Sequence, residues 1–379
     1  MTNTPAVITL FRTVALQLPA PDSIRLDDVQ AETAIVLGLA PLLHMAVDDV
    51  EDLLPASYSL PVACAALAAK NTTDRQTAAL HGILDMAPGV SDHVTLLKGI
   101  DTRDRYPARR LRRMGDIDLL VDADDLRGFE EGLLRLGYEL EALRMPERFY
   151  TDHHHSRPFV HPETDVRVEV HRELAGPNTQ LGMVPAFETE SVLSHRFLSE
   201  CDGRPVYRLG PELSLVYTAS HWCYDLRIPL VCNGLLDFVV TLQNPEHDID
   251  WNLIAGWLDD QRVATALYVM LTYLEKHELA EIDAGFRPAL LDAKKSVGPL
   301  SLRVLHSIID ACLEGRMWSR MDFLGSSTVV WRTITCSRGP AWNAFRVPLS
   351  LLFRGSDGLL SIGSQRLTPR SKAPMLGEH

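Results

Sequence analysis

The chain has 379 residues, of which 46% are hydrophobic and 23% are charged, and its formal net charge is −13 at pH 7. This length and composition predict a globular protein that buries a large core in two or three units. The acidic balance argues against attraction to a membrane surface, and no apolar run is near the roughly 18 residues that would span one.

The cysteines and the N-terminus indicate the compartment. Six cysteines are scattered without the spacing of a metal or redox site, which fits a reduced, cytoplasmic setting. They are Cys64, Cys201, Cys223, Cys232, Cys312 and Cys336. The first residues lack the basic start and the small-residue cleavage site of a signal peptide, so we do not expect secretion.

Residues 1–88 are predicted to form an N-terminal helical region. Apolar residues recur with helical spacing in 31–45 and 60–69, and these alanine-rich pieces favour helix. Pro55 and the Pro88-Gly89 pair interrupt the pattern. We expect these helices to pack against a sheet formed by later residues.

The next unit, 89–176, begins with a short apolar run that ends at Lys98 and Gly99. A glycine after a strand lets backbone N–H groups approach a phosphate, and the N-terminus of a following helix favours that anion. A basic cluster follows, formed by Arg103, Arg105, Arg109, Arg110, Arg112 and Arg113. This cluster favours binding of a small acidic ligand over binding of a nucleic acid, which needs a broader basic face. The alternative interpretation of the cluster is a solvated, arginine-rich loop.

Asp116 and Asp118 stand one residue apart at the start of an otherwise apolar strand. Side chains at i and i+2 of a strand share one face, with their Cα atoms roughly 7 Å apart. Two neighbouring carboxylates on a half-buried strand repel each other unless a cation compensates them, and Mg²⁺ prefers such oxygen ligands. The alternative is a half-solvated pair at a strand end.

A second strand is predicted at 165–171, where apolar and polar residues alternate with a period of two. Its valines form a buried face, and Glu169 and His171 lie on the other face. If this strand pairs beside the first, Glu169 joins Asp116 and Asp118, and three carboxylates can hold two metal ions for displacement at phosphorus. The alternative is that Glu169 lies on the solvated face of a sheet.

Five histidines fall within nineteen residues, namely His153, His154, His155, His161 and His171. On a strand, His153 and His155 can face one ion but His154 cannot, and no cysteine or finger-like histidine spacing lies near. Zinc binding is therefore the least favoured interpretation. A contact near the nucleotide or acceptor suits His171, which shares the face of Glu169, and ordinary polar packing is the remaining alternative.

Turn and cap residues divide the rest of the chain. A helix is predicted from its N-cap Asp124 to Gly137, Tyr138 starts an extended piece, and Gly176-Pro177 ends the unit. Residues 177–330 are predicted to form a C-terminal helical domain after a loop-like stretch. Its helical patterns cover 212–224, 234–243, 263–277 and 301–314, with Asp248 or Asp250 capping a helix that begins at Trp251.

Two polar residues stand out on these apolar helices. His221 is interpreted as a core residue in preference to a nucleotide contact, whereas Asp237 needs a partner such as Arg227 or a ligand. Residues 331–379 form a C-terminal segment, either an amphipathic tail that binds a partner or a helix that completes the fold. From about residue 361 this segment is predicted to be disordered.

The motifs together resemble a known family, the uncharacterised nucleotidyltransferases of the DNA polymerase β superfamily. The resemblance covers roughly residues 30 to 280. It rests on Leu97-Lys98-Gly99, Arg112 or Arg113, Gly115 to Val121, Asp124-Asp125-Leu126, Leu136-Gly137-Tyr138, His153 to His155, Val168 to His171, Glu212 to Leu215, His221 and Leu235 to Phe238. The chain departs from the pattern at Ile100, where many superfamily members carry a second small residue after the glycine.

The resemblance implies an α+β fold: a small mixed β-sheet nucleotidyltransferase core flanked by helices. It also implies roles for individual residues. Asp116 and Asp118 would ligate the metals, and Glu169 would be the third carboxylate or the general base toward the acceptor. The nucleotide would be bound by Lys98, Gly99, Arg112, Arg113, Gly115 and His171.

The predicted function is metal-dependent transfer of an NMP from an NTP, with Mg²⁺ or Mn²⁺ as cofactor and pyrophosphate as the leaving group. We expect the acceptor to be a small molecule or a natural-product peptide, with no nucleic acid or membrane as partner. One alternative is nucleotidylation of a protein partner, as antitoxin-type enzymes perform. A second is a non-catalytic nucleotide-binding scaffold.

Overall fold

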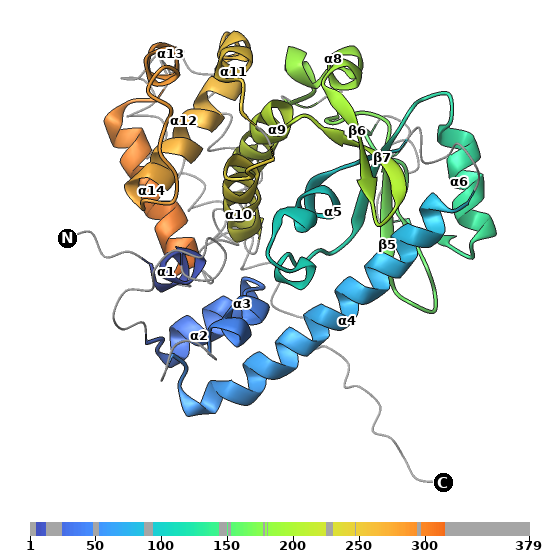
Figure 1. Cartoon of the computed structure of the whole chain (residues 1–379), viewed down its shortest axis with the longest axis horizontal. Coiled ribbons are helices and arrows are strands. Elements are labelled where there is room, and N and C mark those ends of the chain that lie inside the picture. Colours follow the sequence, from blue (N-terminus) through green and yellow to red (C-terminus); the bar gives the residue numbers. More distant parts are fainter. Residues whose placement is uncertain are drawn as a thin grey trace, which may run out of the picture.

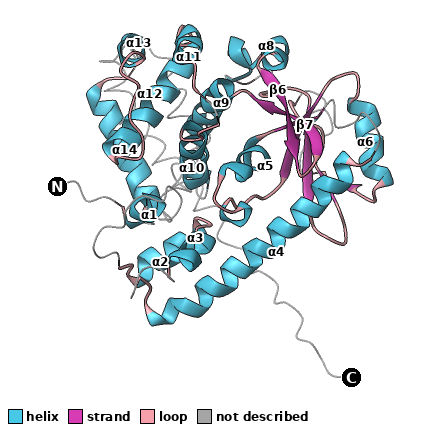
Figure 2. Cartoon of the chain, in the orientation of Figure 1, coloured by secondary structure: helices cyan, strands magenta, loops and turns pink. Residues whose placement is uncertain are grey.

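The protein consists of a mixed β-sheet flanked by helices. The computed structural model describes residues 5–12, 25–47, 53–86, 94–143, 150, 153–176, 179, 181–224, 230–246, 248–293 and 297–314. Within these ranges, one seven-stranded sheet lies beside a large group of helices, as Figures 1 and 2 show. The predicted α+β fold is confirmed.

The N-terminal region is helical, as predicted. Its helices are α1 (Ala6–Leu10), α2 (Asp28–Val36), α3 (Ala40–Ala46) and α4 (Ser59–Leu84). A capping box begins α2, because the Asp27 carboxylate accepts a hydrogen bond from the Gln30 backbone N–H at 2.8 Å and the Gln30 side chain accepts one from the Asp27 N–H at 2.9 Å. The long helix α4 runs from α2 to the sheet (Figure 1).

The strands follow the order β3-β4-β5-β2-β1-β7-β6 across the sheet. Their bounds are β1 (Val94–Leu96), β2 (Ile117–Val121), β3 (Glu139–Leu140), β4 (Phe159–Val160), β5 (Arg167–His171), β6 (Arg196–Cys201) and β7 (Arg204–Leu209). The central strand β2 pairs antiparallel with β1 and parallel with β5. The predicted pairing of the two carboxylate-bearing strands is therefore present, with Asp118 directly opposite Glu169.

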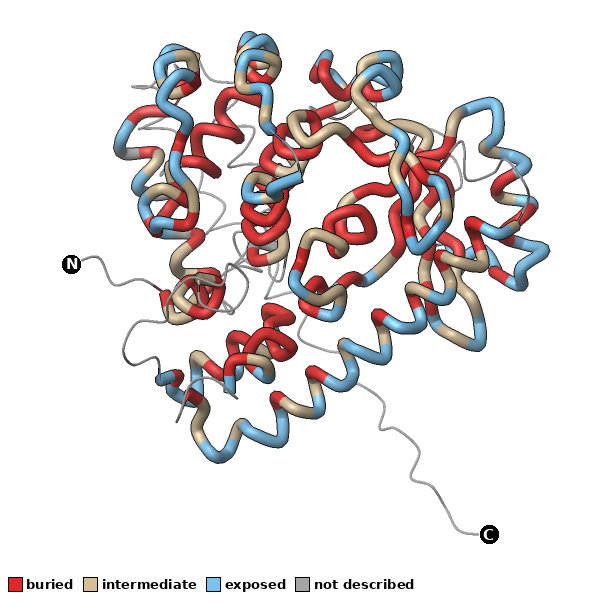
Figure 3. Tube along the Cα trace, viewed as in Figure 1, coloured by how far each residue is buried: buried red, intermediate tan, exposed pale blue. Residues whose placement is uncertain are grey.

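The two faces of β2 pack against different helices. Ile117, Leu119 and Val121 enter a core with residues of α4 and of α6 (Leu126–Arg135). Side chains on the opposite face, including Leu120, meet a second core that contains α9 (Pro211–Tyr224) and α10 (Leu230–Leu242). Because side chains alternate along a strand, Asp118 lies on this second face together with the short helix α5 (Lys98–Thr102). Figure 3 shows α5, α9 and α10 as largely buried.

The sheet extends past residue 176, into a stretch that the sequence pattern predicted to be loop-like. This stretch contains α8 (Thr189–Ser194) and the β6–β7 hairpin, and β7 pairs parallel with β1. The hairpin turns at Asp202 and Gly203, whose φ values are +50° and +78°. An Asp-Gly pair with two positive φ values is typical of tight hairpin turns, so a sequence signal for this hairpin was present. The same sheet therefore contains strands from both sides of residue 176, and the predicted domain boundary there stays a prediction.

The helix between β2 and β3 corrects one local prediction. Asp125, not Asp124, occupies the N-cap of α6, and its side chain makes no capping hydrogen bond. The helix ends as predicted, because Gly137 has a φ of +89°, a conformation that glycine adopts without strain. Tyr138 then leads into β3.

The C-terminal helices of the described residues agree with the predicted patterns. Besides α9 and α10, they are α11 (Trp251–Trp257), α12 (Gln261–Lys276) and α14 (Pro299–Leu313), whereas α13 (Arg287–Ala293) was not among the predicted helices. Asp250 caps α11 by accepting hydrogen bonds from the backbone of Asn252 at 2.9 Å and Leu253 at 3.2 Å. The predictions for 331–379 lie outside the described residues.

The described residues also contain short 3-10 helices, namely η2 (Ala56–Tyr58), η4 (Arg103–Arg105), η5 (Arg109–Leu111), η6 (Leu181–Met183) and η7 (Pro185–Phe187). Among the described helices, none combines the length and the apolar character that crossing a membrane requires.

The contact between α9 and α10 predicts a position that does not tolerate an added methyl group. A Cβ on Gly234 would lie 2.3 Å from Cδ1 of the buried Trp222 ring, so Gly234→Ala should lower the free energy of unfolding by about 1–3 kcal/mol. In the matched control Gly82→Ala in α4, the added Cβ meets nothing within 4 Å. This control should instead gain up to about 1 kcal/mol from helix propensity. Urea unfolding of both variants checks the prediction, which equal stabilities would contradict.

Candidate active site

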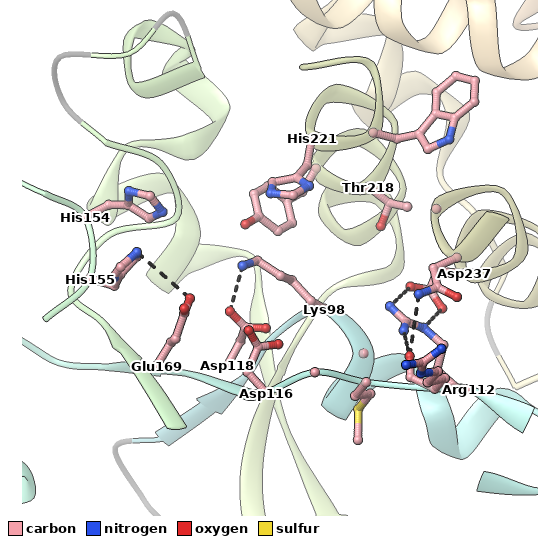
Figure 4. A pocket seen from close by; sticks show the side chains of 18 residues that line it. Lys98, Arg112, Asp116, Asp118, His154, His155, Glu169, Thr218, His221 and Asp237 are labelled. Carbon is pink, nitrogen blue, oxygen red and sulfur yellow. Dashed lines mark hydrogen bonds and ion pairs between the residues drawn. The ribbon is translucent and has the colours of Figure 1, made fainter. Parts of the chain in front are cut away.

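A cavity of about 420 Å³ lies between the sheet and helices α9 and α10. Residues from the sheet, from α5, α9 and α10 and from the segments between them line it, and Figure 4 shows how their side chains converge. They are Lys98, Gly99, Arg112, Arg113, Met114, Gly115, Asp116, Asp118, His154, His155, Glu169, Tyr217, Thr218, His221, Trp222, Asn233, Gly234 and Asp237. All nine predicted site residues except His171 are among them.

The three predicted carboxylates face this one cavity. Asp118 and Glu169 are directly opposite each other on the parallel strands β2 and β5, and Asp116 immediately precedes β2. Asp118 is the most enclosed: its Oδ1 accepts hydrogen bonds from Lys98 Nζ at 2.6 Å and from His171 Nε2 at 2.8 Å. The sheet register thus supplies the arrangement that the residue spacing predicted.

Neighbouring side chains compensate the negative charge of the three carboxylates only in part. Lys98 and His171 hold the pKa of Asp118 well below its usual range, although burial opposes this. The charge of Asp118 and partial burial then raise the pKa of Asp116 to about 6. Burial and the charge of Asp118 raise the pKa of Glu169 to about 7. The raised pKa values of Asp116 and Glu169 therefore mean that neighbouring side chains do not fully compensate the negative charge of these acids when they lose their protons, and a bound cation would relieve that charge.

Lys98 supplies the positive charge that is present. It is the first residue of α5 and has a φ of +50°, an uncommon value for a residue with a side chain. Burial disfavours its ammonium, but the attraction of Asp118 prevails and raises the pKa of Lys98 above its ordinary value. In this structure Lys98 binds Asp118, and its predicted contact with a phosphate stays a prediction.

His171 reaches the cavity only through Asp118. Its side chain is fully buried, and burial together with the charge of Lys98 lowers its pKa to about 4. A neutral ring whose Nε2 faces a carboxylate oxygen carries its proton there, so Nε2–H donates to Asp118. His171 therefore orients Asp118. The nucleotide contact predicted for it stays a prediction.

Gly99 is needed where the loop before β2 crosses α5. A Cβ at this position would lie 2.7 Å from Met114 Cγ and 3.2 Å from Arg112 Cζ. The absence of a side chain thus lets this loop, which carries Gly115 and Asp116, lie against the start of α5. Gly115 itself has open space around it and faces the cavity.

The arginine cluster does not form one basic ligand surface. Arg105 pairs with Asp101 at 2.8 Å, and Arg109 pairs with Asp104 and Asp202, both at 2.6 Å. Only Arg112 and Arg113 of the cluster line the cavity. Sequence spacing alone did not reveal these carboxylate partners, because one of them lies on the distant β6–β7 hairpin.

Arg112 forms a buried ion pair that joins the loop before β2 to α10. Its Nε and Nη2 each donate to the Asp237 carboxylate at 2.7 Å. Tyr106 and Thr102 donate to the same carboxylate at 2.8 and 2.9 Å. The expected partner Arg227 lies outside the described residues, and the structure gives Arg112 as the partner of Asp237.

The helical wall of the cavity was not predicted. Tyr217, Thr218, His221 and Trp222 reach it from α9, and Asn233 reaches it from α10. His221, interpreted as a core residue, is half-buried and lines the cavity. The spacing of these α9 residues places them on one side of the helix, which was the signal available in the sequence.

Two of the three consecutive histidines before β4, His154 and His155, also border the cavity. Residues 153–155 form a bend with one β-bridge, His155 to His171, and not the strand assumed from the sequence. Each of the three rings offers a nitrogen within 4.8 Å of the other two. The expectation that His154 would point away from its neighbours, which assumed a strand, was therefore wrong.

The fold and this cavity agree with the comparison with known protein families. Residues 27–277 match the model of a family described as uncharacterised nucleotidyltransferase. The match runs from the start of α2 to the end of α12 and covers more than half of the chain, so the chain belongs to this family. Membership supports a transferase of nucleotidyl groups with a nucleoside triphosphate as substrate. No curated protein and no solved structure matches the chain.

The raised pKa of Glu169 predicts a pH-dependent stability in metal-free buffer. Its ordinary pKa of 4.5 applies to the unfolded chain, whereas the folded protein holds the proton up to about pH 7. The folded state therefore binds more protons between these values, and the free energy of unfolding should fall as pH rises through that window. Glu169→Gln removes this loss, so the variant should be the more stable protein above pH 7 and lose that advantage near pH 4.5.

Melting temperatures across this pH range, measured with a chelator present, check the prediction. Glu200→Gln, which changes an exposed carboxylate of β6 away from the cavity, is the matched control and should follow the wild type. If the melting temperature of Glu169→Gln differed from that of the wild type by the same amount at every pH, the account of the carboxylates would be contradicted.

Proposed function

We propose that the protein is a metal-dependent nucleotidyltransferase that moves an NMP from an NTP to a small-molecule or natural-product peptide acceptor. In this reaction an acceptor oxygen bonds to the α-phosphorus, the bond to the β-phosphate oxygen breaks, and pyrophosphate leaves. One observation carries the proposal: Asp116, Asp118 and Glu169 face the same cavity beside Lys98. Family membership supports the nucleotidyl transfer itself.

The donor atoms around the cavity fit a hard divalent cation. Oxygen ligands from Asp116, Asp118 and Glu169 suit Mg²⁺ or Mn²⁺, and the raised pKa values of Asp116 and Glu169 reflect negative charge that such an ion would relieve. One oxygen each of Asp118 and Glu169 lies within 4.8 Å of His171 Nε2 in the same cluster. When bound, the cation would neutralise charge on the phosphates and on the attacking oxygen.

The remaining side chains have roles that follow from their positions. Lys98 is the first residue of α5. Its ammonium, which now donates to Asp118, would also donate to a phosphate oxygen of the substrate. Gly115 has open space around it that would admit the phosphates, Gly99 would lie beside them, and the exposed Arg113 lines the same cavity. Glu169 would be either the third carboxylate ligand of the cation or the general base that accepts the proton of the acceptor hydroxyl.

The helical wall favours a small acceptor. The cavity of about 420 Å³ is bounded by α9 and α10 opposite the carboxylates, and its size is in the range of small-molecule sites. The cysteines in the described residues, Cys64, Cys201, Cys223, Cys232 and Cys312, form no disulfide bond, which supports a reduced, cytoplasmic setting. We expect neither a nucleic acid nor a membrane as partner.

A labelling experiment tests the reaction and the size of the acceptor together. The protein is incubated with Mg²⁺ and each NTP carrying a label at the α-phosphorus, in the presence of either the ultrafiltrate or the retained macromolecules of a cell extract. We expect label to enter a component of the ultrafiltrate with release of pyrophosphate. Label in a retained protein would establish protein nucleotidylation instead. No transfer in either fraction would favour the scaffold.

Variants of Asp118 and His171 should distinguish the proposed metal ligand, Asp118, from the residue that orients it, His171. Asp118→Asn should abolish transfer, because it removes a carboxylate that would hold the cation. His171→Gln should reduce transfer by about 10–100-fold, the usual effect of losing a partner that orients a metal ligand. Asp124→Asn, an exposed acid just beyond the other end of β2, is the control and should act as wild type. Equal activity of all three variants would remove Asp118 from the mechanism.

A further inference from the structure

Residues 153–156 are held firmly against β5. Ser156 N–H donates to the Val170 carbonyl and Arg172 N–H donates to the His154 carbonyl, both at 2.8 Å. His155 forms a β-bridge with His171. The backbone is therefore tied on both sides of His155, and the three consecutive histidine side chains project from an anchored bend.

The three imidazole rings lie together. Their centroids are 4.1 Å apart for His153 and His154, 4.1 Å for His153 and His155, and 4.9 Å for His154 and His155. One ring nitrogen from each lies within 4.8 Å of the other two. Zinc–nitrogen bonds of about 2.0–2.1 Å place two ligand nitrogens roughly 3.3 Å apart in a tetrahedral site. Binding a zinc-type ion would therefore require rotation of the rings about the anchored backbone.

The hydrogen bonding of His155 prepares it as a ligand. Its Nδ1 lies 2.7 Å from the Ser156 carbonyl oxygen, which can only accept, so Nδ1 carries the hydrogen. Its Nε2 then presents a lone pair. A histidine ligand commonly donates its other ring N–H to a backbone carbonyl in this way. Glu169 Oε2 lies 3.9 Å from this Nε2, as the dashed line in Figure 4 marks.

We propose that His153, His154 and His155 form a second metal site, separate from the cation site of the aspartates, that takes a transition-metal ion of the zinc type. Imidazole nitrogens suit Zn²⁺, whereas Mg²⁺ is bound through oxygen. The ion lies next to Glu169 and fixes the anchored bend to the edge of the cavity. This site lies beside Glu169, which also belongs to the proposed nucleotidyl-transfer site, but its three ligands include neither Asp116 nor Asp118.

Zinc binding to the full chain tests this proposal without nucleotide or magnesium. The protein is treated with EDTA, desalted and titrated with ZnCl₂ against a chromophoric chelator, and bound zinc is counted by mass spectrometry of the metal. Co²⁺ in place of Zn²⁺ reports nitrogen ligation through its visible absorption. The variants are His153→Gln, His154→Gln and His155→Gln. The matched control is His161→Gln, a histidine of the same segment that packs edge-on against Tyr138.

We expect one zinc ion per chain in the wild type and at least tenfold weaker binding in each of the three cluster variants. His161→Gln and Asp118→Asn should bind zinc as the wild type does. The proposal is overturned if the wild type takes up no zinc, or if the folded cluster variants bind it unchanged. It is also overturned if Asp118→Asn loses the ion, since the ion would then belong to the aspartates. Three separate variants, each checked for cooperative unfolding, keep the result interpretable if one fails to fold.

Discussion

The parallel pairing of β2 with β5 is the constraint on which the candidate active site depends. Its register sets Asp118 directly opposite Glu169, on the face of the sheet that α9 and α10 cover. A shift of one residue would turn one of these carboxylates into the opposite core, because side chains alternate along a strand. The valines and leucines that fill that core therefore fix the register, and the register brings the acids together.

Bringing the acids together creates an electrostatic problem that the surrounding residues solve only in part. Lys98 and His171 stabilise the charge of Asp118 at 2.6 and 2.8 Å, while Asp116 and Glu169 hold their protons more tightly than isolated carboxylates do. A fold without a cationic ligand has little reason to concentrate three acids in one cavity. The proposal that this protein binds a metal–nucleotide complex rests on this uncompensated negative charge and on membership of the nucleotidyltransferase family.

Local patterns predicted what depends on neighbouring residues in the chain. The alternation in 165–171 and the spacing of Asp116 and Asp118 predicted both strands and the carboxylate face. What depends on distant partners was not predictable, such as the pairing of Arg112 with Asp237 and the cavity wall from α9. The β6–β7 hairpin is a different case, because its Asp202-Gly203 turn is a local signal that is present in the sequence.

Calorimetric titration of each NTP in the presence of Mg²⁺, for the wild type and for Asp118→Asn, tests the central claim most directly. It requires no knowledge of the acceptor. The account predicts that the wild type binds an NTP only when Mg²⁺ is present and that the variant loses this binding. Binding that persists without the ion, or that is unchanged in Asp118→Asn, would contradict a metal–nucleotide site at the β2–β5 carboxylates.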